Sequence, residues 1–570
     1  MPRSRRCRLA ALLSTWLATA PAVVAPGEPP ADLILTKTRV WTADAKTPWA
    51  EAVAVRGDRI VYVGDARGAL AWRGPKTEVH ELSSRLVLPG FNDAHVHLMS
   101  GALSLERVDL IEDASLPAVQ ARIKAFAAAN PGSPWVLGRG WFYGSFPGDL
   151  PTKEQLDAVV SDRPAYMECY DGHSGWANSK ALALAGITRD TKDPENGVIV
   201  RDPVTGEATG ALKESATALV ESKIPVPDAE ARYALLLRAL PRLNSHGITS
   251  VQDTASSDLA SDPAEDAPLF ARAKKEGRLT VRLAVAVLMK QGDVDRPIAQ
   301  ELRLRAEHDD PFLRYHTIKG YVDGVIEAKT AAVLEPYADG GTGLPNWQPE
   351  ALQAAVVAAD KAGLQVYLHA IGDRGVRMAL DAHAAAAKTN GHRDRRGRVE
   401  HIETISPADY PRFAALGVVA SMQPLHANPD QNLMDVWAKN AGPDRASRGF
   451  GWGDLERAGA RLAFGSDWPV VTPDVRRGLY CAVTRKTREG RPAGGWLPGQ
   501  AVSLESALRH YTIDAAYASF EEDVKGSLSP GKLADIVVLA DDLFLLVPET
   551  ILTTRVLLTV VGGRVVYRAD

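Results

Sequence analysis

Two histidines, His95 and His97, lie two positions apart in the stretch PGFNDAHVHLM. Alternate residues of a β-strand point to the same face, so a strand here would project both imidazoles together. Neutral imidazole nitrogen is the commonest metal donor among side chains, and two of them begin a zinc-type site without completing it. The alternative is a pair of hydrogen-bonded or solvated histidines at a strand end, and further ligands would decide between the two interpretations.

Further polar residues stand at or near the ends of other apolar stretches. They are Lys319 in YHTIKGYVDG, His369 in LQVYLHAIGD, His401 in GRVEHIET and Asp467 directly after LAFGS. Strand alternation places Tyr367 and His369 on one face, and Val399 and His401 on one face of the next strand. Taken singly, each has a structural explanation: a core histidine, a solvated lysine, a helix N-cap for the aspartate. Together they form a candidate catalytic constellation.

The elements that must position these residues follow a strand-then-helix rhythm. Eight short apolar stretches alternate with Ala-rich helical segments: RLVLPGFNDAHVH, GITSVQDT, LTVRLAVAVL, YHTIKGYVDG, LQVYLHAIGD, GRVEHIET, VVASMQP and RLAFGSDWP. This pattern predicts an α/β fold, a parallel (β/α)8 TIM barrel over residues 89–510. Active sites of such barrels lie at the carboxyl ends of the strands, where the polar residues fall.

Two other regions depart from this rhythm. The connection over 104–241 is too long for one barrel unit and predicts an insertion after the first barrel strand. Residues 31–88 and 525–570 both alternate apolar and polar residues around Gly and Asp turns. We expect the two chain ends to pair into one composite, β-sandwich-like domain.

The first 25 residues have the layout of an export signal: several arginines, an apolar segment, then small residues. The SRR triplet weakly suggests the twin-arginine route. The alternative, an uncleaved membrane anchor, is disfavoured because the apolar run is short and interrupted by Thr15, Thr19 and Pro21. We therefore expect a periplasmic or secreted protein without stable membrane insertion, whose mature chain begins near Pro21 or Pro26.

Mass spectrometry of the exported protein should show no peptide from 1–20, and an intact N-terminus would contradict this.

Bulk composition excludes some partners. A formal net charge of −4 and a pI of 6.4 provide no basic surface for nucleic acid.

Outside the leader only Cys169 and Cys481 carry thiols, and we expect them to be unpaired.

Seven motifs, in order, resemble the amidohydrolase superfamily, and within it the family 3 branch that includes N-substituted formamide deformylase-like proteins. They are LVLPGFNDAHVHLMSGAL, DGHSGWANSKALALAGI, KGYVDGVIEAKTAAVLEPY, HAIGDRGVRMALDA, RVEHIE, FGSDWPV and GSLSPGKLADIVVL. The resemblance implies a divalent metal cofactor, one or two zinc ions. It implies that His95, His97 and Asp467 bind one ion, that His369 and His401 bind the other, and that carboxylated Lys319 bridges them. A single-ion site with unmodified Lys319 is the alternative.

Candidate substrate-binding residues are less strongly indicated. They are His173 in DGHSGW, Lys329 in VIEAKTA, Trp141, Gln423 and Trp468. Surface exposure explains a lone loop histidine equally well, and aromatic residues near loops often serve packing alone. Lys329 also departs from the family pattern, in which a glycine-containing segment with arginine is more frequent.

The predicted function is metal-dependent hydrolysis of a non-peptide C–N bond, an amide or N-formyl group, in a small organic substrate. Asp467 would accept a proton from the attacking water and pass it to the departing nitrogen. A deaminase or lactonase on the same scaffold is the nearest alternative, and a non-catalytic metal-containing binding protein is the alternative of another class. A homodimer is compatible with the sequence.

Overall fold

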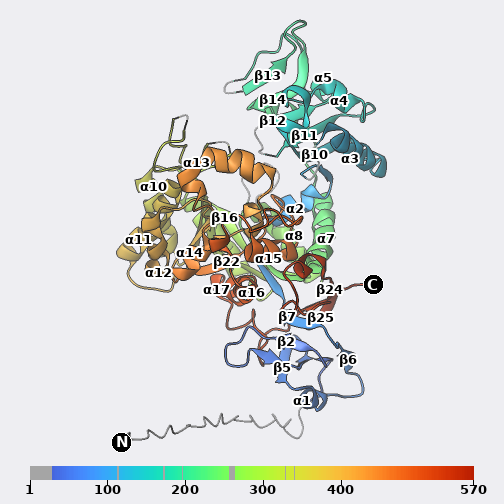
Figure 1. The fold of residues 1–570 in the computed structure, drawn as a ribbon, viewed down its shortest axis with the longest axis vertical. Coiled ribbons are helices and arrows are strands. Elements are labelled where there is room, and N and C mark those ends of the chain that lie inside the picture. Colours follow the sequence, from blue (N-terminus) through green and yellow to red (C-terminus); the bar gives the residue numbers. More distant parts are fainter. Residues whose placement is uncertain are drawn as a thin grey trace, which may run out of the picture.

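The computed structural model describes residues 29–111, 115–170, 174–194, 197–255, 263–327, 329–338 and 340–570. A parallel barrel of eight strands lies at the centre, with a β-sandwich at one end and a separate α/β insertion at the other (Figure 1). The predicted fold class is therefore confirmed. Within the described ranges, no helix combines the length and apolar character needed to cross a bilayer.

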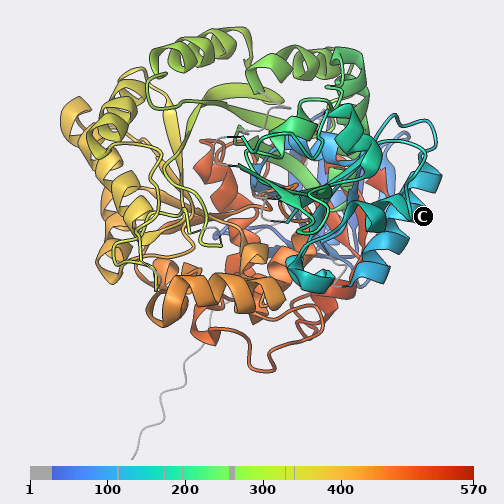
Figure 2. The same cartoon turned by 90° about the horizontal axis from the view of Figure 1, so that it is seen from above.

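The barrel strands follow one another in chain order, and each pairs in parallel with the next. They are β8 (Phe91–Val96), β15 (Ile248–Asp253), β16 (Arg282–Leu288), β18 (Leu313–Tyr321), β19 (Gln365–Ala370), β20 (Arg398–His401), β21 (Val419–Met422) and β22 (Arg461–Phe464). Seen from above, helices surround the strands (Figure 2). Most strand residues are buried because helices cover one side and the barrel interior the other, which explains the nearly continuous apolar runs.

Helices accompany the barrel strands, and most of them lie outside the ring that the strands form (Figure 2). They are α2 (Leu98–Ser104), α7 (Ala229–Ser245), α8 (Pro263–Lys275), α9 (Asp295–Glu307), α10 (Pro349–Lys361), α11 (Asp373–Asn390), α12 (Tyr410–Leu416), α13 (Ala438–Ala446), α14 (Trp452–Arg457), α15 (Val475–Thr484), α16 (Leu504–His510) and α17 (Ile513–Ala518). Asp228 and Asp474 cap α7 and α15, each accepting a hydrogen bond from a backbone N–H of the first turn.

Backbone hydrogen bonds close the barrel between its first and last strands. The Asp467 N–H donates to the His95 carbonyl oxygen at 2.7 Å, and the His97 N–H donates to the Trp468 carbonyl oxygen at 2.8 Å. A parallel bridge also joins Val96 to Trp468. These contacts fix the segment after β22 directly beside the end of β8, although the two lie far apart in the sequence.

The sandwich consists of two sheets. One is formed by β5 (Arg59–Gly64), β4 (Ala52–Arg56), β1 (Leu33–Thr36) and β6 (Glu78–Glu81). The other is formed by β25 (Arg564–Arg568), β24 (Val556–Val561), β23 (Ile536–Leu539), β7 (Leu86–Pro89), β2 (Arg39–Trp41) and β3 (Trp49–Ala50), so it combines strands from both chain ends. A buried ion pair ties this domain to the barrel: Arg282 Nε, at the start of β16, lies 2.6 Å from Asp535 Oδ2.

The insertion has its own six-stranded sheet. Its strands and helices are β9 (Arg107–Asp109), α3 (Leu116–Ala129), β10 (Val136–Trp141), α4 (Lys153–Asp157), β11 (Ala165–Cys169), β12 (Ser174–Ala177), α5 (Ser179–Leu184), β13 (Gly197–Arg201), β14 (Ala208–Glu214) and α6 (Ala218–Glu221). The expected end of the insertion, Pro241, lies inside α7, which packs against α2 and β15 as part of the barrel. The insertion therefore ends before α7, earlier than the sequence predicted. Arg139 of β10 donates to the Pro469 carbonyl oxygen at 2.8 Å, so the insertion contacts the carboxyl end of the barrel.

Candidate metal centre

A first donor group lies where β8 ends. His95 Nε2 lies 3.4 Å from Asp467 Oδ1, and His97 Nε2 lies 3.0 Å from the same oxygen. One donor atom from each of these residues lies within 4.8 Å of the other two. Two imidazoles and one carboxylate at this spacing could bind a single divalent ion. The structure therefore brings together three of the predicted ligands.

A second donor group uses the other oxygen of Asp467. Oδ2 lies 3.9 Å from His401 Nδ1 and 3.6 Å from His426 Nε2. Donor atoms of His401, His426 and Asp467 again lie within 4.8 Å of one another. Asp467 is thus placed between two pairs of histidines, with one carboxylate oxygen facing each pair.

His369 lies beside this second group. Its ring centroid is 4.5 Å from that of His401 and 5.0 Å from that of Tyr321. Its Nε2 lies 3.4 Å from the Gly324 carbonyl oxygen and 3.8 Å from Asp323 Oδ1. The structure brings His369 to the cluster, and its role as a ligand stays a prediction.

Lys319 points into the same region from β18. Its side chain is fully buried, and its Nζ has no hydrogen-bond partner among the described residues. Burial is the main reason why the pKa of Lys319 is lowered to about 8. The Tyr321 ring centroid lies 5.0 Å from Nζ. A lysine whose neutral form is accessible near neutral pH fits the predicted carbamate, because the neutral amine is the form that captures CO2.

The electrostatics of the cluster favour metal ligands. Burial and nearby Lys319 lower the pKa of His95 to about 4 and that of His369 to about 3, and burial lowers the pKa of His401 well below its usual value. Burial alone would raise the pKa of Asp467, but His95 and His97 outweigh it and hold the pKa well below its usual range. Neutral imidazoles and an ionised carboxylate are the forms that bind a divalent ion. Buried His95 Nε2 also has no hydrogen-bond partner in the described structure, so the donors present fit a metal.

Unusual backbone conformations aim two of these side chains. Asp467 has φ of 61°, and His401 has φ of 73°. Non-glycine residues with positive φ are uncommon and cluster at functional sites. The conformation of His401 also corrects an expectation: Val399 packs in the large hydrophobic core, whereas His401 faces the metal cluster. Simple alternation fails here because the backbone turns at the last residue of β20.

Glu400 orients His95 from β20. Its Oε2 lies 2.6 Å from His95 Nδ1, so the Nδ1–H donates to the carboxylate and leaves Nε2 to face Asp467. Arg398 holds Glu400 with two bonds of 2.8 and 2.9 Å, and also donates to the Ala94 carbonyl oxygen at 2.6 Å. Burial would raise the pKa of Glu400, but Arg398 and His95 lower it below its usual value. Arg398, Glu400 and His95 thus form a buried chain of hydrogen bonds behind the first donor group.

Glu400→Gln is expected to weaken metal binding by about 10–100-fold, the usual cost of losing an outer partner of a histidine ligand. The amide keeps the size of the side chain but removes the negative charge that fixes the His95 tautomer. The measurement is competition for Zn2+ against a chromophoric chelator. Glu301→Gln is the matched control, because Glu301 is equally buried and, among the residues that the structure describes, accepts only from the Thr317 N–H. An unchanged affinity for Zn2+ in Glu400→Gln would show that Glu400 does not support metal binding through His95.

Two predicted substrate-binding residues lie beside the centre but make other contacts. Gln423 Oε1 accepts from His401 Nδ1 at 2.8 Å, so Gln423 positions a candidate ligand. Gln423 Nε2 is buried and has no hydrogen-bond partner in the described chain. Trp468 is only 3% exposed and packs closely against Gly101, so its ring belongs to the barrel wall.

The other three lie apart from the donor groups. Trp141 is fully buried in the core of the insertion, where its indole N–H donates to the Met167 carbonyl oxygen at 2.9 Å. This placement gives no support to a substrate contact by Trp141. Lys329 lies in the loop after β18, half-buried and with φ of 59°, and stays a candidate. His173 lies outside the described residues. Cys169 and Cys481 are both buried, and neither forms a disulfide within the described residues.

Two site residues were missing from the sequence prediction. His426 lies three residues after Gln423 in SMQPLHA, and Glu400 directly precedes His401. The only signal was their closeness in sequence to predicted residues. Strand alternation predicts that Glu400 and His401 point to opposite faces, so Glu400 was not expected beside the ligands. His426 lies in a turn after β21, where no strand or helix periodicity predicts the direction of a side chain.

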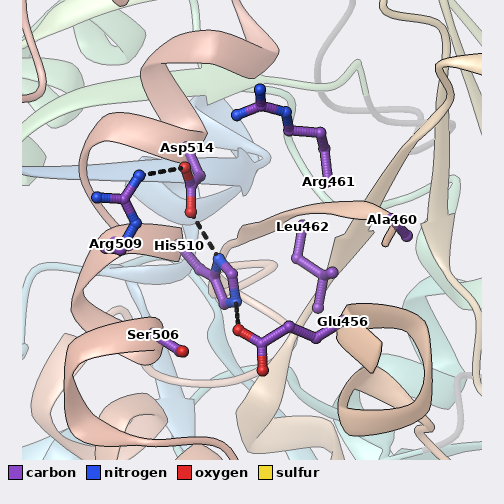
Figure 3. A pocket seen from close by; sticks show the side chains of 8 residues that line it. All are labelled: Glu456, Ala460, Arg461, Leu462, Ser506, Arg509, His510 and Asp514. Atoms are coloured by element: carbon purple, nitrogen blue, oxygen red, sulfur yellow. Dashed lines mark hydrogen bonds and ion pairs between the residues drawn. The ribbon is translucent and has the colours of Figure 1, made fainter. Parts of the chain in front are cut away.

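A separate pocket lies at the amino end of β22, and Figure 3 shows the side chains that line it. It is lined by Glu456, Ala460, Arg461, Leu462, Ser506, Arg509, His510 and Asp514. Arg461 begins β22, whereas the metal cluster lies beyond the ends of the strands. His510 Nδ1 lies 2.9 Å from Asp514 Oδ2, and His510 Nε2 lies 3.5 Å from Glu456 Oε1. Residues at the amino-terminal face of a TIM barrel usually contribute to stability, and the contacts of His510 with two carboxylates fit such a structural role.

Fold and donor groups together define a class: barrel enzymes that hold a divalent metal at the carboxyl ends of their strands. Comparison with known proteins then gives the family. The sequence model that describes the amidohydrolase family matches residues 78–567. The chain therefore belongs to this family of metal-dependent hydrolases.

Several relatives match along nearly their whole length. The chain is 34% identical to the protein LONG AFTER FAR-RED 3 of Arabidopsis thaliana, over 94% of this chain and 92% of the relative. It is 30% identical to N-substituted formamide deformylase of Arthrobacter pascens, over 90% and 94%. A metal-dependent hydrolase from Pyrococcus horikoshii of known structure is 25% identical and superposes with a TM-score of 0.71, covering 91% of this chain and 99% of that one.

Proposed function

We propose that this enzyme hydrolyses a non-peptide C–N bond, an amide or N-formyl group, in a small organic molecule. The observation that carries the proposal is Asp467, whose two oxygens each face a pair of histidines at the mouth of the barrel. The relative named N-substituted formamide deformylase supports an N-formyl substrate.

The proposed cofactor is one or two zinc ions, because imidazole and carboxylate donors suit zinc. When bound, the metal supplies a nucleophilic water near neutral pH and polarises the carbonyl. His95 and His97 would hold one ion with Asp467, His369 and His401 would hold the other, and carboxylated Lys319 would be shared by both. In the carboxylation, neutral Lys319 Nζ forms a bond to the carbon of CO2 while one C=O π bond breaks, and the nitrogen gives a proton to water, which leaves an anionic oxygen donor.

Asp467 is the proposed proton carrier. Its ionised carboxylate can accept a proton from the attacking water, and its burial keeps that proton away from bulk solvent. Delivery of the proton to the departing nitrogen completes the hydrolysis, because an amine leaves poorly as an anion. Gln423 Nε2 can donate to a polar group of the substrate.

The decisive experiment is an activity screen of the metal-loaded protein. Its panel contains N-formyl amines, N-acyl amino acids, cyclic amides, amidines and lactones. Turnover of an N-formyl amine or another amide, lost on chelation and restored by zinc, is the expected result. A preference for lactones or for amidine deamination would show that the enzyme cleaves a different bond from the one proposed. Metal binding without any turnover would favour a binding protein.

We also propose export, with the leader outside the described residues.

A further inference from the structure

We propose that His426 is a ligand of a second divalent ion, which shares Asp467 with the ion at His95 and His97. The inference rests on the proposed function only in that both require a metal centre. It adds a ligand from the seventh barrel unit to those predicted from the sequence.

The position of the His426 imidazole carries this inference. Its Nε2 is buried and has no hydrogen-bond partner in the described part of the chain. It lies 3.6 Å from Asp467 Oδ2, close to the 3.4 Å that separates His95 Nε2 from Oδ1 in the first group. The two sides of the carboxylate therefore present nitrogen donors at similar spacing.

His401 completes the arrangement. The His401 and His426 rings lie nearly parallel, 5° apart in plane and with centroids 6.0 Å apart. Gln423 Oε1 lies 2.8 Å from His401 Nδ1, the same nitrogen that lies 3.9 Å from Asp467 Oδ2, so Gln423 fixes the orientation of the His401 ring beside the second donor group. One short turn after β21 thus orients one candidate ligand and supplies another.

The local backbone holds His426 in place. It lies in the 3-10 turn η4 (Pro424–Ala427), which packs against α15, and its N–H donates to the Gln423 carbonyl oxygen at 3.0 Å. A purely structural histidine at this position would normally satisfy its buried nitrogen with a protein partner. The orphaned Nε2 beside a carboxylate is instead the arrangement of an open ligand position.

The test measures metal stoichiometry and cobalt absorption after chelation, reloading with Co2+ and desalting. We expect the wild type to retain two equivalents, and His426→Ala to lose about one of them while the first group keeps its ion. The cobalt absorption of the second site should disappear in the same variant. His426→Asn serves if the alanine variant unfolds. The control is His316→Asn, because His316 is also buried, its ring nitrogens have no hydrogen-bond partner among the described residues, and it lies earlier on β18, near Phe520.

Two results would overturn the inference. One is a folded His426 variant that retains both ions with unchanged affinity and absorption. The other is a wild-type protein that holds a single ion. Failure of the proposed function is distinguishable from failure of this inference. If the wild type binds two ions and the His426 variant binds one, but no amide is turned over, the His426 assignment stands and only the proposed reaction is wrong.

Discussion

Asp467→Asn is expected to fold normally and to lose at least ~10²-fold in kcat on the best amide substrate, within the ~10²–10⁴-fold range of general acid–base groups. The amide keeps the shape of the side chain and can still offer an oxygen to an ion. It cannot accept and deliver a proton at neutral pH. Activated esters should lose less, because a good leaving group departs without a delivered proton. Steady-state kinetics on matched amide and ester substrates measure the difference.

The structure removes the simpler explanation of this residue. A helix N-cap would tolerate asparagine, but α15 begins at Val475 and its cap is Asp474, seven residues further along. Asp474→Asn is therefore the control: asparagine also caps helices well, so turnover should stay near that of the wild type. A folded Asp467→Asn enzyme with kcat within a few-fold of wild type on an amide would refute the proton-carrier assignment.

The double variant His95→Ala with His97→Ala is expected to lose the ion of the first donor group and to lose activity. Both nitrogen donors of the first group disappear, and the Asp467 oxygen that faces them cannot hold an ion alone. Metal analysis of chelator-free protein and turnover in the presence of added zinc measure the two losses. His80→Ala is the control, because His80 pairs with Glu78 in the sandwich, away from the barrel. Full metal content in the double variant would show that the ion binds elsewhere.

The sequence by itself determined the elements and most of the candidate ligands. Apolar runs of strand length between helical segments gave all eight barrel strands, because burial on both faces imposes continuous apolar residues. Strand ends carry Lys319, His369 and Asp467 for a reason visible locally: each interrupts or follows such a run with a polar group. Alternation was reliable on β19, where Tyr367 and His369 both face the interior.

Only the tertiary structure decided which groups meet. Barrel closure sets Asp467 against His95 and His97, and sheet register brings Glu400 to His95 across 305 positions of sequence. No local pattern encodes such contacts, because they depend on the packing of every strand between. The turn at His401 and the placement of His426 depend on backbone conformations outside regular strand geometry, where periodicity has no meaning. The burial of Trp141 was hidden for a related reason: residue type shows that an aromatic ring seeks apolar surroundings, and only the fold shows whether a core or a substrate provides them.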